Sequence, residues 1–115
     1  MKRTPIKTLV LTGLISFSLI KAQSGGSLTF SEVMFIPSES NGEFIEIYNS
    51  SDIEIIDLSK LKFKYSTSTA DNVVEFVGGR FLLPNKFAVI LEADYDFTNG
   101  VYKNLIPPDV VVLKL

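Results

Sequence analysis

The feature that most constrains the fold of this chain is the stretch at residues 43–49, together with the turn that follows it. Ile45 and Ile47 alternate there with more polar neighbours, which is the two-residue period of a β-strand with one buried face. Residues 49–52 read Asn-Ser-Ser-Asp, and short polar side chains of this kind hydrogen-bond the local backbone in turns. The stretch therefore predicts one half-buried strand that ends in a tight turn.

Short apolar runs separated by turn-forming residues continue along the chain. We expect further strands at residues 28–35, 61–65, 73–77, 87–91 and 110–115. In the first of these, regular alternation would place Leu28 and Phe30 on one face and Val33 and Phe35 on the other. This switch predicts a β-bulge near Ser31 and Glu32, or else a Phe35 side chain outside the core. The run at 87–91 has no polar member, so we expect it to be buried on both faces. Together these runs predict an all-β sandwich or barrel.

The hydrophobic core of that fold should contain the inward members of each run. We expect it to include Leu28, Phe30, Val33, Ile45, Ile47, Leu58, Leu61, Phe63, Val74, Phe76, Phe87, Val89 and Leu91.

The run at 110–115 is apolar, and no turn or charge cluster follows it in the sequence. Exposed apolar edge strands promote aggregation, and complete domains usually protect them. We therefore expect further strands beyond Leu115. A different reading is an exposed edge at 110–115 that accepts a strand from a partner by β-augmentation.

Composition limits the chemistry that the chain can support. A length of 115 residues provides one domain. The sequence contains no Cys and no His, which removes most routes to a zinc site, a thiol nucleophile or a Ser–His pair. We expect no catalytic residues and no cofactor.

The N-terminus has the three-part order of a secretory signal peptide. Three basic residues among the first seven precede an apolar run at 8–20, and the small residue Ala22 follows it. The run is shorter than the roughly 20 residues that cross a bilayer, so a membrane anchor is the weaker interpretation. We expect a signal-peptide helix cleaved after Ala22 (residues 1–22), a flexible lead-in at 23–27, and a secreted, cell-surface or periplasmic protein.

Cleavage would change the charge of the protein. The whole chain has 11 basic and 13 acidic residues, and the predicted signal peptide removes Lys2, Arg3, Lys7 and Lys21 without any acid. The remaining chain would carry 7 basic and 13 acidic residues, a net charge of −6. An acidic surface does not favour nucleic acid or an anionic membrane as a partner.

Four segments of the sequence resemble a known family, the lamin-tail domain of the bacterial, secreted kind. They are residues 31–34 (Ser-Glu-Val-Met) with Pro37, residues 43–49, residues 57–59 (Asp-Leu-Ser) with the strand through Leu61 and Phe63, and residues 83–86 (Leu-Pro-Asn-Lys). At the last of these the family often has Pro-Gly, and Asn85 stands in place of the glycine.

The resemblance implies an immunoglobulin-like β-sandwich over residues 28–115, with the usual closing strands missing. It also implies a non-catalytic module for binding or structural interaction, with a protein partner or covalently linked downstream domains. The alternative function is an N-terminal accessory domain of a larger secreted hydrolase or nuclease whose catalytic part lies beyond Leu115. The resemblance carries no catalytic residues to this chain.

Residues 92–100 offer the best candidate for a metal site. Asp94 and Asp96, with Glu92 and Asn99, could present oxygen ligands to Ca²⁺. Their spacing does not fit an EF-hand, so a solvated acidic turn is the preferred interpretation.

Other candidate constellations are weaker. Glu43 and Glu46 lie three apart on one strand and should point to opposite faces, so they cannot flank one bond. Ser59 with Lys60 looks like a turn rather than a catalytic pair. Half-buried aromatics could form a stacking surface, although core packing is the preferred interpretation for them. These aromatics are Phe44, Tyr48, Tyr65, Tyr95, Phe97 and Tyr102.

Overall fold

The computed structural model describes residues 27–64 and 69–115. The predicted signal peptide at 1–22 and Tyr65 lie outside these ranges. Within them the chain is built from strands and two short 3₁₀ helices. In order, these are β1 (Leu28–Met34), β2 (Phe44–Asn49), β3 (Ile56–Asp57), η3 (Leu58–Lys60), β4 (Lys62–Phe63), β5 (Asp71–Asn72), β6 (Val74–Val77), β7 (Phe81–Leu82), β8 (Phe87–Leu91), η4 (Val101–Asn104) and β9 (Val111–Lys114).

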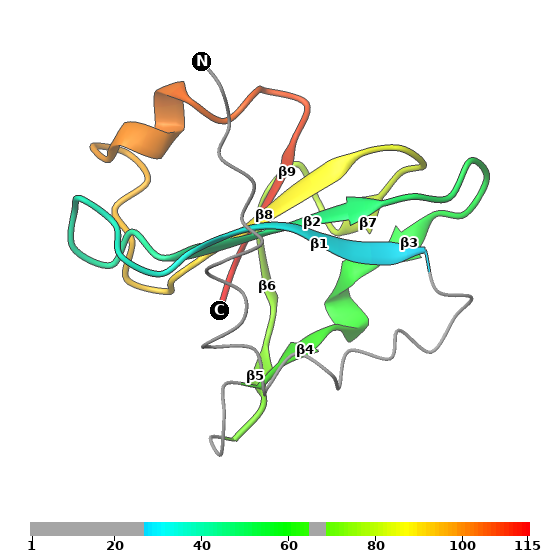
Figure 1. Cartoon of the computed structure of the whole chain (residues 1–115), viewed down its shortest axis with the longest axis horizontal. Coiled ribbons are helices and arrows are strands. Elements are labelled where there is room, and N and C mark those ends of the chain that lie inside the picture. Colours follow the sequence, from blue (N-terminus) through cyan, green and yellow to red (C-terminus); the bar gives the residue numbers. More distant parts are fainter. Residues whose placement is uncertain (1–26, 65–68) are drawn as a thin grey trace.

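A five-stranded sheet in the order β1-β2-β8-β9-β6 is the main layer (Figure 1). All its pairs are antiparallel except β8 with β9, which run parallel. The register of β1 on β2 shifts between Phe30 and Glu32, which confirms the predicted bulge. Regular alternation would point Phe30 and Val33 to opposite faces of the sheet, and the bulge allows both side chains to be half-buried.

The second layer consists of two short ladders, β3–β7 and β4–β5, joined by η3. Its inward side chains Leu58, Phe63 and Leu82 are buried in one cluster with Ile47 and Ile90 of the main sheet. The two layers therefore enclose a core, and the fold is an all-β, sandwich-like structure, as predicted. The strand predicted at 61–65 is only two residues long in the described part of the chain.

The chain passes between the layers at Val73. β5 pairs with β4 in the second layer, and β6 pairs with β9 in the main sheet. Val73 lies between them and is buried against the core. Strands that switch sheets at a corner are a common way to close a sandwich.

Residues 92–110, which we call the cover segment, pack on the other face of the main sheet. Its side chains Tyr95, Phe97, Tyr102, Ile106 and Val110 contact a second cluster formed by Val89, Leu91 and Val112. The cover segment includes η4, which Figure 1 shows in orange near the loop between β1 and β2. β8 and β9 are consequently buried on both faces, which explains the apolar runs at residues 87–91 and 111–113.

Three members of the predicted core are exposed. Val74 and Phe76 are 58% and 46% exposed, because β6 is the last strand of the sheet and the preceding residue Val73 faces the interior. Phe87 is 39% exposed and packs beside Tyr48, with 4.6 Å between ring centroids. The core prediction was wrong for these three side chains. The other ten predicted members are all buried or half-buried.

The interpretation of residues 110–115 as an exposed edge strand was also wrong. β9 lies between β8 and β6, and Val111, Val112 and Leu113 are buried. Its apolar sequence follows from this interior position. Within the described ranges no helix has the length and apolar character needed to cross a membrane.

Replacing Ile47 by Ala should cost about 2–5 kcal/mol of the free energy of unfolding, because the side chain is 1% exposed in the main core. Val74→Ala is the matched control and should change stability by no more than about 0.5 kcal/mol. Chemical denaturation of both variants measures this. Similar losses in the two variants would contradict the register of β2 and β6.

Candidate functional site

Three large apolar side chains lie on the outer face of the β3–β7 ladder. Residues alternate between faces along a strand, so the buried Leu82 leaves Phe81 and Leu83 pointing outward. Ile55 also points outward, because Ile56, which pairs with Leu82, is packed on the core. Ile55, Phe81 and Leu83 are 57%, 50% and 49% exposed. We call these three residues the β3–β7 outer face.

Exposed apolar side chains are common singly, but adjacent ones rimmed by polar groups mark interaction sites. The pairing of Ile56 with Leu82 places Ile55 next to Leu83 on the same face, and Phe81 pairs with Asp57. Residues 81–83 are Phe-Leu-Leu, so either face of this segment is apolar, and the burial of Leu82 places Phe81 and Leu83 on the outer face. The β3–β7 outer face is therefore a candidate interaction surface.

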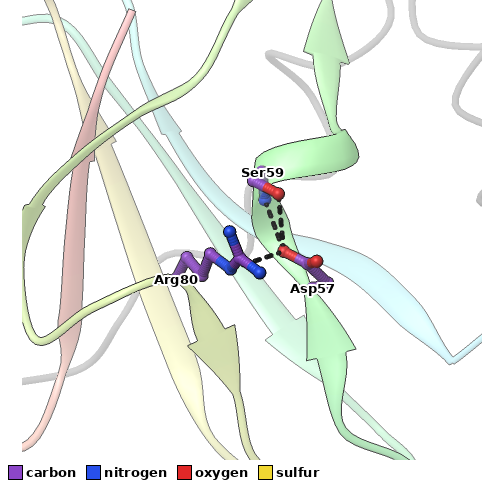
Figure 2. Close-up of polar contacts among 3 residues, drawn as sticks. All are labelled: Asp57, Ser59 and Arg80. Atoms are coloured by element: carbon purple, nitrogen blue, oxygen red, sulfur yellow. Dashed lines mark hydrogen bonds and ion pairs between the residues drawn. The ribbon is translucent and has the colours of Figure 1, made fainter.

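A polar cluster of Asp57, Ser59 and Arg80 borders this surface (Figure 2). Asp57 Oδ1 accepts hydrogen bonds from the Ser59 hydroxyl at 2.7 Å and the Ser59 backbone N–H at 3.1 Å. Arg80 Nε lies 3.5 Å from the same oxygen, and the Arg80 guanidinium lies 4.9 Å from the centre of the Phe81 ring. The cluster joins β3, η3 and the start of β7.

The chemistry of this cluster fits a helix cap better than a catalytic pair. The hydrogen bond from the Ser59 hydroxyl is the main cause that lowers the pKa of the Asp57 carboxyl, and a carboxylate with a lowered pKa is a weak base. Asp57 is the N-cap of η3, and Ser59 and Lys60 lie within this short helix. The turn predicted at Ser59 and Lys60 is thus a single 3₁₀ turn fixed by Asp57.

Asp57→Ala should lower the denaturation midpoint at neutral pH, because it removes the cap of η3. The folded pKa of Asp57 lies below the ordinary Asp value of 3.8, so the stabilising contribution of its carboxylate is present above that value and is lost as the pH falls through the folded pKa. The difference between wild type and Asp57→Ala should therefore narrow below about pH 4 in denaturation curves.

Arg80→Gln is the matched control for that experiment. It removes an exposed ion pair and the contact of Arg80 with the Phe81 ring but leaves the cap of η3 in place, so it should have the smaller effect on the midpoint. If the denaturation midpoints of wild type and Asp57→Ala differed by the same amount down to about pH 2, this would contradict the assigned role of the carboxylate.

A second polar network lies under the cover segment. The Tyr95 hydroxyl donates to Glu39 Oε1 at 2.6 Å and accepts from the Tyr102 backbone N–H at 3.1 Å. The Tyr102 hydroxyl donates to the Gly42 carbonyl oxygen at 2.7 Å. A side chain at Gly100 would collide with the Tyr95 ring, so this close approach requires glycine. The network fastens the cover segment to the loop between β1 and β2.

Burial, followed by the hydrogen bond to Glu39, raises the pKa of Tyr95 to about 12. The hydroxyl is therefore protonated at neutral pH and serves as a donor. This arrangement does not suit a general base, because such a group needs a pKa near the working pH.

Tyr95→Phe should be less stable than wild type at neutral pH, because the Tyr102 backbone N–H loses its acceptor. The folded pKa of Tyr95 exceeds the ordinary Tyr value of 10.0, so its stabilising contribution is present below pH 10 and is lost as the pH rises towards 12. The difference in stability between wild type and Tyr95→Phe should therefore shrink between pH 10 and 12, as measured by denaturation curves. A gap independent of pH from 9 to about 12 would contradict the assignment.

The model of one protein family matches this chain. The Lamin Tail Domain model covers residues 21–114, which is most of the chain. The chain belongs to the Lamin Tail Domain family. A search of curated proteins and a search of solved structures found no match.

One departure from the usual lamin-tail pattern has a structural explanation. Asn85 replaces the frequent glycine after Pro84, and it adopts φ 57°, a conformation that Asn tolerates better than most residues. Its side chain accepts from the Tyr48 hydroxyl at 3.0 Å and donates to Asp52 at 3.1 Å. The turn before β8 is thereby tied to the turn after β2.

The acidic loop of this lamin-tail domain is organised around one carboxylate. Asp96 accepts hydrogen bonds from the backbone N–H groups of Thr98 and Asn99 and from the Asn99 side-chain amide. In residues 27–64 and 69–115, no three carboxylate, His or Cys side chains are grouped to hold a metal ion. These hydrogen bonds agree with the preferred interpretation of a turn, and they do not test the weaker interpretation, calcium binding at Asp94 and Asp96.

The remaining candidates are distributed through the lamin-tail fold. Phe44, Tyr95, Phe97 and Tyr102 belong to the cluster between the cover segment and the main sheet, so core packing is confirmed for them. Glu46 accepts a hydrogen bond from Ser31, which fits an outward polar position. The β3–β7 outer face was not predicted from the sequence. The Phe-Leu-Leu run at 81–83 was the available signal, since a two-residue strand can bury only one face of it.

Proposed function

We propose that this lamin-tail domain is a non-catalytic, secreted, immunoglobulin-like module that binds a protein partner. The observation that carries the proposal is the β3–β7 outer face, which presents three adjacent, half-exposed apolar side chains in a member of a family of binding and structural domains. The signal peptide predicted at residues 1–22 supports a secreted, cell-surface or periplasmic location.

The energetics of the β3–β7 outer face favour a protein ligand. Covering the exposed half of Ile55, Phe81 and Leu83 would contribute about 1 kcal/mol per side chain. Arg80 and Asp57 at the rim can add charged hydrogen bonds that orient the partner. The acidic net charge of the chain argues against nucleic acid or an anionic membrane in this role.

The proposal predicts that partner binding depends on this surface. The whole chain, immobilised and exposed to the secreted proteins of its source, should retain a partner that a Phe81→Ser/Leu83→Ser variant loses by at least about tenfold. A Val101→Ser/Leu105→Ser variant provides the matched control, because these apolar side chains are at least as exposed as Leu83 (49% and 70%) but lie on the cover segment. Quantitative mass spectrometry would measure retention, and loss of the same partner from both variants would rule out the assigned surface.

The alternative is an accessory domain linked to a secreted hydrolase or nuclease beyond Leu115. Membership of a family whose modules are often attached to larger secreted enzymes favours it. The intact mass of the native secreted protein separates the two functions. A mass that matches residues 23–115 supports a separate binding module, whereas a much larger mass supports the accessory domain.

A further inference from the structure

The second edge of the main sheet has an unusual composition. β6 is the last strand beside β9, and within the described ranges it pairs with no other strand (Figure 1). All four of its residues are exposed, and the sequence is Val-Glu-Phe-Val. Natural proteins protect edge strands with Lys or Pro, with other charged side chains, with bulges, or by keeping the strand short. β6 carries no Lys or Pro, but it is four residues long and contains Glu75 and a bulge.

A bulge in β6 limits how much of the edge is available. The register on β9 shifts between Glu75 and Val77, so Phe76 is the extra residue. Phe76 is held in place by an edge-to-face contact with Phe97 at 5.4 Å and by Lys114 Nζ, 4.9 Å from its ring centre. Lys114 is fixed in turn by hydrogen bonds to the carbonyl oxygens of two residues in the cover segment. The bent edge is therefore rigid and suited to a short strand.

Glu75 indicates the charge of the strand that would fit. Its side chain is exposed, and it has no hydrogen-bond or ion-pair partner in the part of the chain that the structure describes. Pairing of β6 with β6 of a second copy would bring two Glu75 carboxylates into one short ladder. Like charges in such a ladder are destabilising, whereas a Lys or Arg opposite Glu75 would be favourable.

The opposite edge does not offer the same site. β1 also has a bulge, between Phe30 and Glu32, so the two edges do not differ in this respect. They differ in exposure, because five of the seven residues of β1 are half-buried, whereas all four residues of β6 are exposed.

We propose that β6 binds an extended strand of a different protein, which is apolar at alternate positions and has Lys or Arg opposite Glu75. The unpaired edge of β6 provides the backbone hydrogen bonds, and Val74 and Val77 provide the apolar contacts. The inference rests on the proposed binding role but uses a surface separate from the β3–β7 outer face.

Two fluorescein-labelled, capped peptides of about seven residues test the proposal. In both, valine alternates with threonine, and the central residue is lysine in one and glutamate in the other. Fluorescence anisotropy with the whole chain should show a Kd for the lysine peptide about fivefold below that for the glutamate peptide. Glu75→Lys should reverse this preference, and Glu75→Gln should abolish it.

Glu32→Lys is the matched control, because it makes the same change in charge on the opposite edge strand. It should leave the peptide preference unchanged. Failure of the lysine peptide to bind at about 1 mM, or a preference that follows Glu32 rather than Glu75, would overturn the assignment. The Phe81→Ser/Leu83→Ser variant should bind the lysine peptide normally, so failure of the edge site and failure of the proposed partner surface are distinguishable.

Discussion

The fold depends on the burial of β8 and β9 on both faces. Side chains of one parity on these strands pack against the second layer, and those of the other parity pack under the cover segment. A strand that is buried on both sides needs two separate partners, and neither partner here is an extended sheet. One is a pair of two-residue ladders and the other is an irregular segment with one short 3₁₀ helix. Specific hydrogen bonds therefore have to hold the two partners in place.

Those hydrogen bonds are provided by a few buried or half-buried polar side chains. Asn49 is fully buried, and its amide donates to the carbonyl oxygens of Glu54 and Leu82, which attaches the second layer to the end of β2. On the other face, the Tyr95 hydroxyl links Glu39 to the cover segment. No buried side-chain polar atom in the described ranges lacks a partner. The second layer and the cover segment are thus both positioned by polar contacts and stabilised by apolar ones.

The sequence predicted the regular parts of this fold well because their signals are local. The alternation at Ile45 and Ile47 lies within β2, and the bulge at residues 30–32 lies within β1, so each pattern is contained in a single strand. The exposure of Val74 and the interior position of β9 depend on which strands become neighbours, and this information is not contained in any single run. An apolar run such as 111–113 is equally compatible with an exposed edge and with an interior strand. For the same reason the β3–β7 outer face became visible only once the pairing of β7 was known.

The strand order has a consequence for the time course of folding. β9 is the last strand of the sequence described, yet it lies between β8 and β6, which precede it. During synthesis these two strands have left the ribosome before the strand that separates them is available. Non-local pairing of this kind is slow and leaves apolar strand edges open. The sheet of a nascent chain should therefore stay incomplete until residue 114 has emerged. In that interval the apolar edge of β8 is unpaired and would be a binding site for chaperones.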